Sequence, residues 1–281
     1  MNQFKYECIK NVNEDDVYTA FNTGFSDYII NINLPKERFF NHFFGPEGNQ
    51  REYSYIAYEQ NLPIGLILGG MKMYEGILTM RCGTLCIHPQ YRGRGVSNEL
   101  LKLHHLAALE NHCQQLFLEV IKGNDRAIKF YQRNGYQKVY DIHYYSLDLK
   151  SEVIKGVNYV VKPIDLNTIK TIPLKVHLNW QADFDYLEKL TGITYRGIYE
   201  NDQLISAISM SPHGKIYYIW TKPEYRRRGY AKSLILNVCV ELNISKVTIA
   251  FSNSNFFEDF VQKMGFKKDE IVQYEMILPL N

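Results

Sequence analysis

The sequence lacks the features that place a protein in a membrane or on nucleic acid. No apolar run reaches the roughly 18 residues needed to cross a bilayer, and the opening stretch MNQFKYECIK has no apolar signal region. The net charge is only +2 over 281 residues, whereas binding a phosphate backbone usually needs a concentrated basic surface. We therefore expect a cytoplasmic protein whose partner is neither a membrane nor a nucleic acid.

Cysteine is also scarce, and its spacing fits no metal site. The number of cysteines is odd, and reduced thiols are the simplest interpretation. The three histidines between positions 104 and 112 fall on a predicted helix, where surface or packing roles are expected rather than metal ligation. No disulfide and no metal site is predicted from Cys8, Cys82, Cys86, Cys113 and Cys239.

The sequence does contain an internal repeat. PQYRGRGVS at 89–97 is similar to PEYRRRGYA at 223–231, and KFYQRNGYQK at 129–138 is similar to DFVQKMGFKK at 259–268. Both pairs of segments occur in the same order, and their period is far longer than that of a solenoid repeat. The repeat therefore indicates two copies of one fold.

The length of the chain agrees with two domains, each large enough to bury its own core. We predict an N-terminal domain over 1–150 and a C-terminal domain over 151–281, joined near 148–156. Strands alternate with helices and hairpins in each half, which favours a mixed sheet and the α+β class.

In the first half, helices are expected over 13–28, where Asn13 is the N-cap, after the glycines near 95, and from Asn124 to Gly135. The Phe-rich segment 34–48 is expected to be irregular. Strands are expected at 4–10, 53–59, 63–74, 77–89, 115–121, 136–140 and 143–149. In the second half, strands are expected at 158–164, 194–200, 204–210, 215–223 and 246–252, with a helical region over 165–191 and a last helix after 252.

The segment HPQYRGRGVSNELLKLH at 88–104 has the character of an anion site. The first amides of a helix have no internal partner, and the helix dipole makes that end partly positive. Gly93 and Gly95 let the backbone approach and turn, while Arg92 and Arg94 add forked donors, so the segment suits a pyrophosphate. A solvated basic turn is the alternative. The segment is neither a Walker loop nor a dinucleotide fingerprint.

Two segments of the first half resemble the GNAT superfamily of N-acetyltransferases. Arg-Gly-Arg-Gly-Val-Ser at 92–97 follows a strand that ends in His-Pro, as in the acetyl-CoA signature of that family. The later segment LEVIKGNDRAIKFYQRNGY resembles the second conserved block of the family. The resemblance implies a tandem GNAT-like protein. Each domain would have a mixed, mostly antiparallel sheet, flanked by helices and splayed open between its fourth and fifth strands.

The resemblance also implies a site for acetyl-CoA as co-substrate. Leu85, Cys86 and Ile87 would line the pantetheine arm, with a backbone N–H near Ile87 polarising the thioester carbonyl. Asn124 would contact the same arm, although it can equally act only as a helix cap. The pyrophosphate would be held by Arg92, Gly93, Arg94, Gly95, Val96 and Ser97. Ser97 departs from the usual glycine or alanine of the family.

By the same resemblance, Glu119 would be the general base and Tyr131 the general acid. A carboxylate can take the proton that an attacking amine must lose. Tyrosine is ordinarily a weaker acid than a thiol, so Tyr131 would stabilise the thiolate mainly by a hydrogen bond. Two alternatives stay open: Glu119 can face solvent on an alternating strand, and Tyr131 can be a core aromatic residue.

The second half keeps the first block but loses these two residues. Val261 stands where the first half has Tyr131, and Ile249 or Ala250 stands in place of Glu119. We therefore expect this half to be catalytically weak or silent. A possible second cofactor site consists of Arg226, Arg227, Arg228, Gly229, Tyr230 and Ala231.

The sequence thus predicts an acetyl-CoA-dependent N-acetyltransferase. Its acceptor would be a primary amine of a small molecule or peptide, attacking directly in a ternary complex. A non-catalytic acyl-CoA-binding sensor or scaffold is the alternative from another class. An acyltransferase that uses a longer chain is a third interpretation, and the sequence does not name the acceptor.

Overall fold

The computed structural model describes residues 4–30, 32, 34–149, 159–173, 176–253 and 255–280. The chain forms two compact units, which we describe separately. Unit 1 comprises Met1–Val139 and Tyr274–Asn281, and unit 2 comprises Tyr140–Gln273. The predicted boundary between residues 150 and 151 lies outside the described residues. Within the described ranges, no helix is long and apolar enough to span a bilayer.

The sheet of unit 1 has the strand order β1-β2-β3-β4-β5-β12. Neighbouring strands from β1 to β4 are antiparallel, whereas β4 and β5 are parallel. The connection between β4 and β5 therefore has to cross over the sheet, and α3 makes that crossover. The strands are β1 (Lys5–Cys8), β2 (Gln50–Glu59), β3 (Leu62–Tyr74), β4 (Ile77–Ile87), β5 (Gln115–Ile121) and β12 (Lys267–Pro279).

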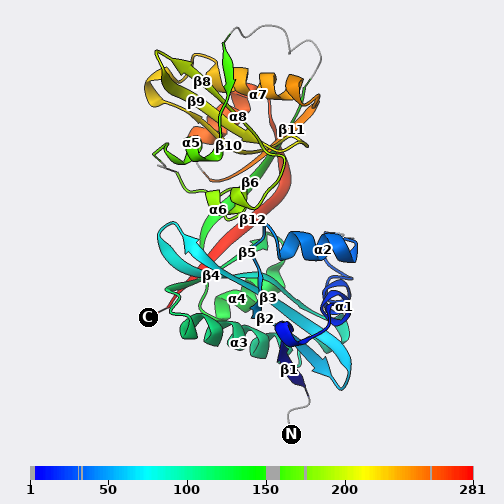
Figure 1. Ribbon diagram of the computed structural model, residues 1–281. Coiled ribbons are helices and arrows are strands. Elements are labelled where there is room, and N and C mark those ends of the chain that lie inside the picture. Colours follow the sequence, from blue (N-terminus) through cyan, green and yellow to red (C-terminus); the bar gives the residue numbers. More distant parts are fainter. Residues whose placement is uncertain are drawn as a thin grey trace. The chain divides into compact units, whose positions relative to one another are not determined.

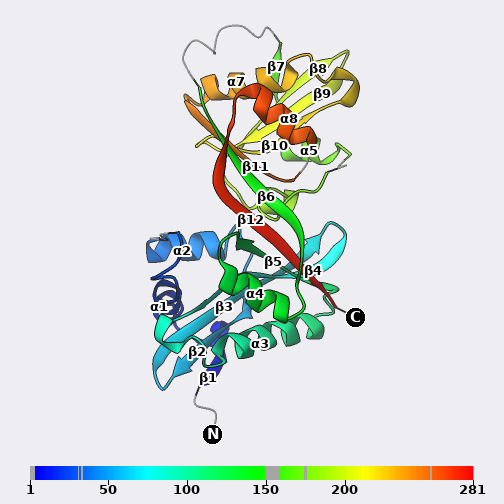
Figure 2. The same ribbon diagram turned by 180° about the vertical axis from the view of Figure 1, so that it is seen from behind.

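Helices cover both faces of this sheet (Figures 1 and 2). One face packs against α1 (Glu14–Gly24) and α2 (Lys36–Phe43), through a core that includes Phe21, Phe39 and Leu66. The other face packs against α3 (Val96–Glu110) and α4 (Asp125–Arg133), through a core that includes Ile67, Leu100 and Tyr131. The α+β class that the sequence predicted is confirmed.

Two local expectations for the first half are corrected by these helices. The segment 34–48 is not irregular, because α2 begins directly after Pro35, which is well suited to start a helix. Phe39, Phe40, Phe43 and Phe44 recur at the spacing of one helical face, and Phe39 is buried, so the segment has the pattern of an amphipathic helix. The first helix begins as predicted, with the Asn13 side chain accepting from Asp16 N at 2.8 Å, but it ends at Gly24 rather than at residue 28.

The last strand of each half belongs partly to the other unit. β6 (Gln137–Asp148) pairs antiparallel with β11 (Lys246–Ser252), from Asp148 opposite Lys246 to Ile142 opposite Ser252. In return, β12 is the strand next to β5 in unit 1, and Leu280 N donates to Gln114 O at 2.8 Å. The sequence predicted two short strands closing the first half. The structure shows one long strand that continues into unit 2.

Unit 2 has the strand order β6-β11-β10-β9-β8-β7. Its predicted hairpin is confirmed as β8 (Thr194–Glu200) and β9 (Gln203–Met210), next to β7 (Val161–Pro163) and β10 (Lys215–Thr221). The long helical region expected over 165–191 is wrong. Among the described residues of this range, the α-helices are α5 (Leu166–Lys170) and α6 (Phe184–Glu188), and Pro173 disfavours continuation of α5. The other helices are α7 (Tyr230–Glu241) and α8 (Asn255–Met264).

Candidate active site

The sheet of unit 1 opens between β4 and β5. These strands pair only from Thr79 opposite Gln115 to Cys82 opposite Leu118. Beyond this point the register of β4 against β3 shifts, which leaves Gly83 as a bulge. A Cβ atom at Gly83 would lie 2.2 Å from Asn49 Oδ1, so a larger residue at the bulge would require the buried Asn49 side chain to move. The remaining residues of β4 and β5 therefore form two separate arms, as expected for a splayed sheet.

A backbone cradle lies at the end of the β4 arm. The short helix Pro89–Tyr91 turns the chain, and Gly93 and Gly95 then have left-handed backbone angles, φ +76° and +85°. Gly95 is the N-cap of α3, so the first amides of a 15-residue helix begin there without internal partners. A side chain built at Gly93 or Gly95 would meet nothing within 4 Å, so the space in front of the cradle is open.

The arginines of the cradle differ in what they contact. Arg92 Nε donates to Ile87 O at 3.0 Å, and its Nη2 donates to Gly24 O at 3.1 Å and to Asp27 Oδ1 at 2.6 Å. Arg94 is exposed and lies over the ring of Tyr91, 5.0 Å from the ring centroid. The structure thus ties Arg92 to protein groups and leaves Arg94 at the surface.

The other predicted cofactor residues lie on the β4 arm and in the first turn of α3. Leu85 and Ile87 belong to the core on the α3 side, together with the buried Val96. Cys86 faces α1 instead, with its Sγ 3.6 Å from Ala20 O, and burial raises the pKa of this thiol to about 12. Ser97 is half-buried in the first turn of α3. Cys86 therefore meets the splay only through its backbone.

Glu119 is part of a buried ion-pair triad. Arg81 on β4 donates from Nη2 to Glu119 Oε2 and from Nη1 to Glu47 Oε2, both at 2.6 Å. The two carboxylate side chains are each 5% exposed. Burial acts to raise the pKa of Glu47, but Arg81 and then His42 outweigh it and lower the pKa to about 2. Glu119 thus faces protein and not bulk solvent, which excludes one alternative open at the sequence level.

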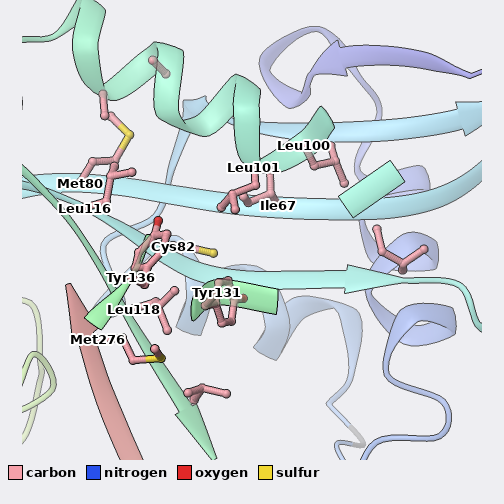
Figure 3. Close-up of a cluster of buried hydrophobic side chains, with 14 of the residues drawn as sticks. Ile67, Met80, Cys82, Leu100, Leu101, Leu116, Leu118, Tyr131, Tyr136 and Met276 are labelled. Carbon is pink, nitrogen blue, oxygen red and sulfur yellow. The ribbon is translucent and has the colours of Figure 1, made fainter. Parts of the chain in front are cut away.

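Tyr131 lies on the opposite face of the sheet, beside Cys82 (Figure 3). Its hydroxyl hydrogen-bonds the Cys82 thiol, and burial is the main cause of a pKa far above the ordinary tyrosine value. Burial also raises the pKa of Cys82 to about 12. Tyr131 is therefore a neutral hydrogen-bond donor, and the ring of Tyr136 packs against it with centroids 5.6 Å apart.

The two candidate catalytic residues meet the same point of β4. Glu119 bonds to Arg81 and Tyr131 contacts Cys82, and these two partners are consecutive residues on opposite faces of the strand. They are the last positions before β4 and β5 part. The structure thus brings Glu119 and Tyr131 to the inner end of the splay from its two sides.

Asn124 lies at the end of the β5 arm and has two contacts. Its side-chain oxygen accepts from Ala127 N at 3.3 Å, which caps α4 as predicted. Its side chain also hydrogen-bonds the hydroxyl of Tyr28, which follows α1. No sequence pattern indicated Tyr28, Asp27 or Glu47, because their partners are distant in the chain. Arg81 carried a weak sign, a lone charge within the apolar run of β4.

The corresponding region of unit 2 keeps the cradle but has no counterpart of Tyr131. Gly229 caps α7 with φ +90°, and Arg227 takes the left-handed position of Gly93 with φ +63°. β10 and β11 pair at only two positions, Lys215–Thr248 and Ile216–Ile249. Val261, in place of Tyr131, is fully buried in an apolar core.

The structure also places an aromatic side chain on this second cradle. The Tyr159 hydroxyl donates to Arg228 O at 2.8 Å, and its ring packs on Tyr230 with centroids 4.3 Å apart. The stack of Arg94 on Tyr91 in unit 1 is repeated by Arg228, which lies 5.3 Å from the centroid of Tyr225.

Comparison with known proteins decides the family. Two models of the acetyltransferase (GNAT) domain match the chain, one over residues 50–138 and the other over 185–279. The chain is a tandem member of the GNAT acetyltransferase family. The family and the fold support acyl transfer as its general activity, and the matches cover one copy of the repeat each.

Solved structures agree with this tandem GNAT architecture. A GCN5-related N-acetyltransferase from Sphaerobacter thermophilus matches 99% of the chain and 96% of its own length, at 10% identity and a TM-score of 0.69. A putative acetyltransferase from Pyrococcus horikoshii matches 100% and 91%, at 16% identity and 0.67. A tandem GNAT protein from the clavulanic acid biosynthesis pathway matches 98% of both chains, at 14% identity and 0.66. At these identities the likeness concerns the fold.

Proposed function

We propose that unit 1 is an acetyl-CoA-dependent N-acetyltransferase that acts on a primary amine of a small molecule or peptide. The observation that carries the proposal is the convergence of three features at one splay. These are the glycine cradle at the start of α3, the carboxylate of Glu119 on the β5 arm, and the hydroxyl of Tyr131 at the inner end. The family and the fold support the acyl-transfer part of the proposal.

The proposed reaction is direct attack in a ternary complex. The amine nitrogen forms a bond to the thioester carbon, its proton passes to Glu119 directly or through water, and the carbon–sulfur bond breaks. Tyr131 then stabilises the leaving thiolate by a hydrogen bond. At pH 7, deprotonating a lysine-like amine of pKa about 10.4 costs roughly 4–5 kcal/mol, so a carboxylate near the amine has a large barrier to lower.

The cofactor would be held mainly by backbone. The amides after Gly95 suit the pyrophosphate, and Arg94 stands at the surface beside them. The open arm of β4 would pair with the pantetheine, and acetyl-CoA supplies the activated acyl group. Unit 2 would then be a structural or acceptor-shaping unit, because it lacks counterparts of Glu119 and Tyr131.

The test is an acetyl-transfer assay on the full chain. We expect free thiol to be released from acetyl-CoA in the presence of an amine panel of small polyamines, amino sugars and peptides. Mass spectrometry should show an acetylated amine in the same sample. Binding of acetyl-CoA without transfer to any amine would instead favour a non-catalytic acyl-CoA sensor. Absence of binding would overturn both.

A further inference from the structure

The segment that follows α1 contacts two of the side chains predicted to bind the cofactor, Arg92 and Asn124. We call residues 25–28 the strap. Its backbone turns tightly, with Phe25 N donating to Phe21 O at 3.1 Å and Tyr28 N donating to Phe25 O at 3.0 Å. The rings of Phe25 and Tyr28 pack edge to face, 4.9 Å between centroids. The strap is therefore a compact turn that projects Asp27 and Tyr28 as neighbours.

Asp27 forms an ion pair with Arg92 at the end of the β4 arm. The Asp27 carboxylate accepts hydrogen bonds from two guanidinium nitrogens of Arg92, including Nη2 to Oδ1 at 2.6 Å. This hydrogen bonding lowers the pKa of Asp27. Arg92 also holds the strap through Gly24 O. The positive charge of Arg92 is thus already neutralised, and the carboxylate near the cradle would repel a pyrophosphate.

The Tyr28 hydroxyl interacts with the Asn124 side chain at the end of the β5 arm. Burial raises the pKa of Tyr28, and the hydrogen bond from Asn124 acts in the opposite direction. Since the Asn124 oxygen accepts from Ala127 N, its amide nitrogen is the group that donates to Tyr28. The Tyr28 hydroxyl therefore lies beside Asn124.

We propose that Asp27 and Tyr28 are further residues of the acyl-CoA site, which hold Arg92 and Asn124 through the strap and release them when the cofactor binds. This inference rests on the proposed function of unit 1. The two arms of the splay are each tied to the strap, and the ion pair is half-exposed on the Asp27 side, with 52% of that side chain accessible. The apparent affinity for the cofactor is then reduced by the fraction of molecules with the strap closed.

The experiment is calorimetric titration of the full chain with coenzyme A, which binds without reacting. Asp27→Asn removes the ion pair, and Tyr28→Phe removes one hydroxyl while keeping the ring. We expect each variant to bind about two- to fivefold more tightly than wild type, the range set by one half-exposed interaction. Tyr28→Phe changes no charge, so its effect separates release of Asn124 from relief of repulsion.

The matched control is Asp15→Asn. It removes another ion pair that ties α1 to α2, between Lys36 Nζ and Asp15 Oδ1 at 2.7 Å, and it touches neither Arg92 nor Asn124. We expect its affinity for coenzyme A to equal that of wild type. Hydrogen exchange gives a second readout, because the amides of the strap should exchange faster once coenzyme A is bound.

The outcomes separate the strap from the proposed function. The strap proposal would be overturned if wild type binds coenzyme A and Tyr28→Phe binds it equally well or more weakly. It would also be overturned if the strap amides become more protected when coenzyme A binds. Binding only in the variants would support it, because the strap would then close the site almost completely. No binding in any of the three proteins would overturn the proposed function itself, and the strap with it.

Discussion

The buried guanidinium of Arg81 constrains how Glu119 can act. Taking a charge out of water is costly unless it is paired and hydrogen-bonded, and here two carboxylates meet one guanidinium. The ion pair with Arg81 holds the Glu119 side chain in one orientation near the end of β5. In the proposed reaction, a carboxylate that is fixed in this way would lose little conformational freedom when the amine binds.

The role of Tyr131 leads to the first prediction. Tyr131→Phe should lower turnover about 10²–10⁴-fold with little effect on acetyl-CoA affinity, because the variant loses the hydrogen bond to the leaving thiolate. Steady-state kinetics and calorimetry measure the two quantities. Tyr136→Phe is the matched control, since its buried hydroxyl has no hydrogen-bond partner and should be dispensable. Normal turnover in Tyr131→Phe would contradict the assignment.

The depressed pKa of Glu47 leads to a stability prediction. Its folded pKa of about 2 lies below the ordinary glutamate value, so the ionised form stabilises the fold above about pH 4.5. This contribution, on the order of 3 kcal/mol, is lost as the pH falls toward 2. Urea unfolding at pH 6 and pH 3 should show a steep loss in wild type and a shallower one in Glu47→Gln.

The control for this measurement is Glu37→Gln, an exposed residue in the first turn of α2. It should reproduce the acid dependence of wild type. An equally steep loss of stability in Glu47→Gln would mean that other carboxylates cause the acid sensitivity.

At the level of single residues, the sequence predicted those candidate site residues that lie close together along the chain. The cradle, Asn124, Glu119 and Tyr131 all belong to two contiguous segments, and the structure places them around one splay. Arg81, Glu47 and the strap were missed, because each acts through a contact between segments far apart in the chain. Hydrophobic periodicity indicates local secondary structure and does not identify contacts between distant segments.

At the level of elements, the exchanged strands are the feature that sequence reasoning could least anticipate. The alternating pattern of β6 shows that it is a strand, but a strand reads the same whichever sheet it joins. Similarly, α2 has only eight residues, and α5 and α6 are too short to show a helical period. The strands and helices next to the cradle were predicted well because turn glycines mark their ends.

The exchange of strands predicts that the first half cannot fold alone. Residues 1–149 would leave β5 without β12, and an unpaired β-strand edge favours aggregation. We expect this fragment to be insoluble or to lack a cooperative unfolding transition. Co-expression with residues 159–281 should restore a soluble complex, which size-exclusion chromatography and circular dichroism would detect. A soluble, cooperatively folded 1–149 fragment would argue against the exchange.

For the whole molecule, the question is how many of the two cradles bind the cofactor. We expect one acetyl-CoA per chain in a calorimetric titration. Unit 2 keeps the left-handed turn, but the Tyr159 hydroxyl donates a hydrogen bond to Arg228 O in the second cradle. In addition, Val261 stands where unit 1 has Tyr131. Arg94→Ala should weaken binding at the single site by removing a cation beside the pyrophosphate. Two sites in wild type would show that Gly229 and its neighbours also bind.

The exchanged strands have a further consequence for the history of the gene. A duplicated copy that loses its catalytic residues is usually free to decay or to be deleted. Here the final strand of the second copy completes the sheet of the first, so a premature stop codon before β12 would remove a strand from both units. Selection on the first copy would therefore also act on the reading frame of the second.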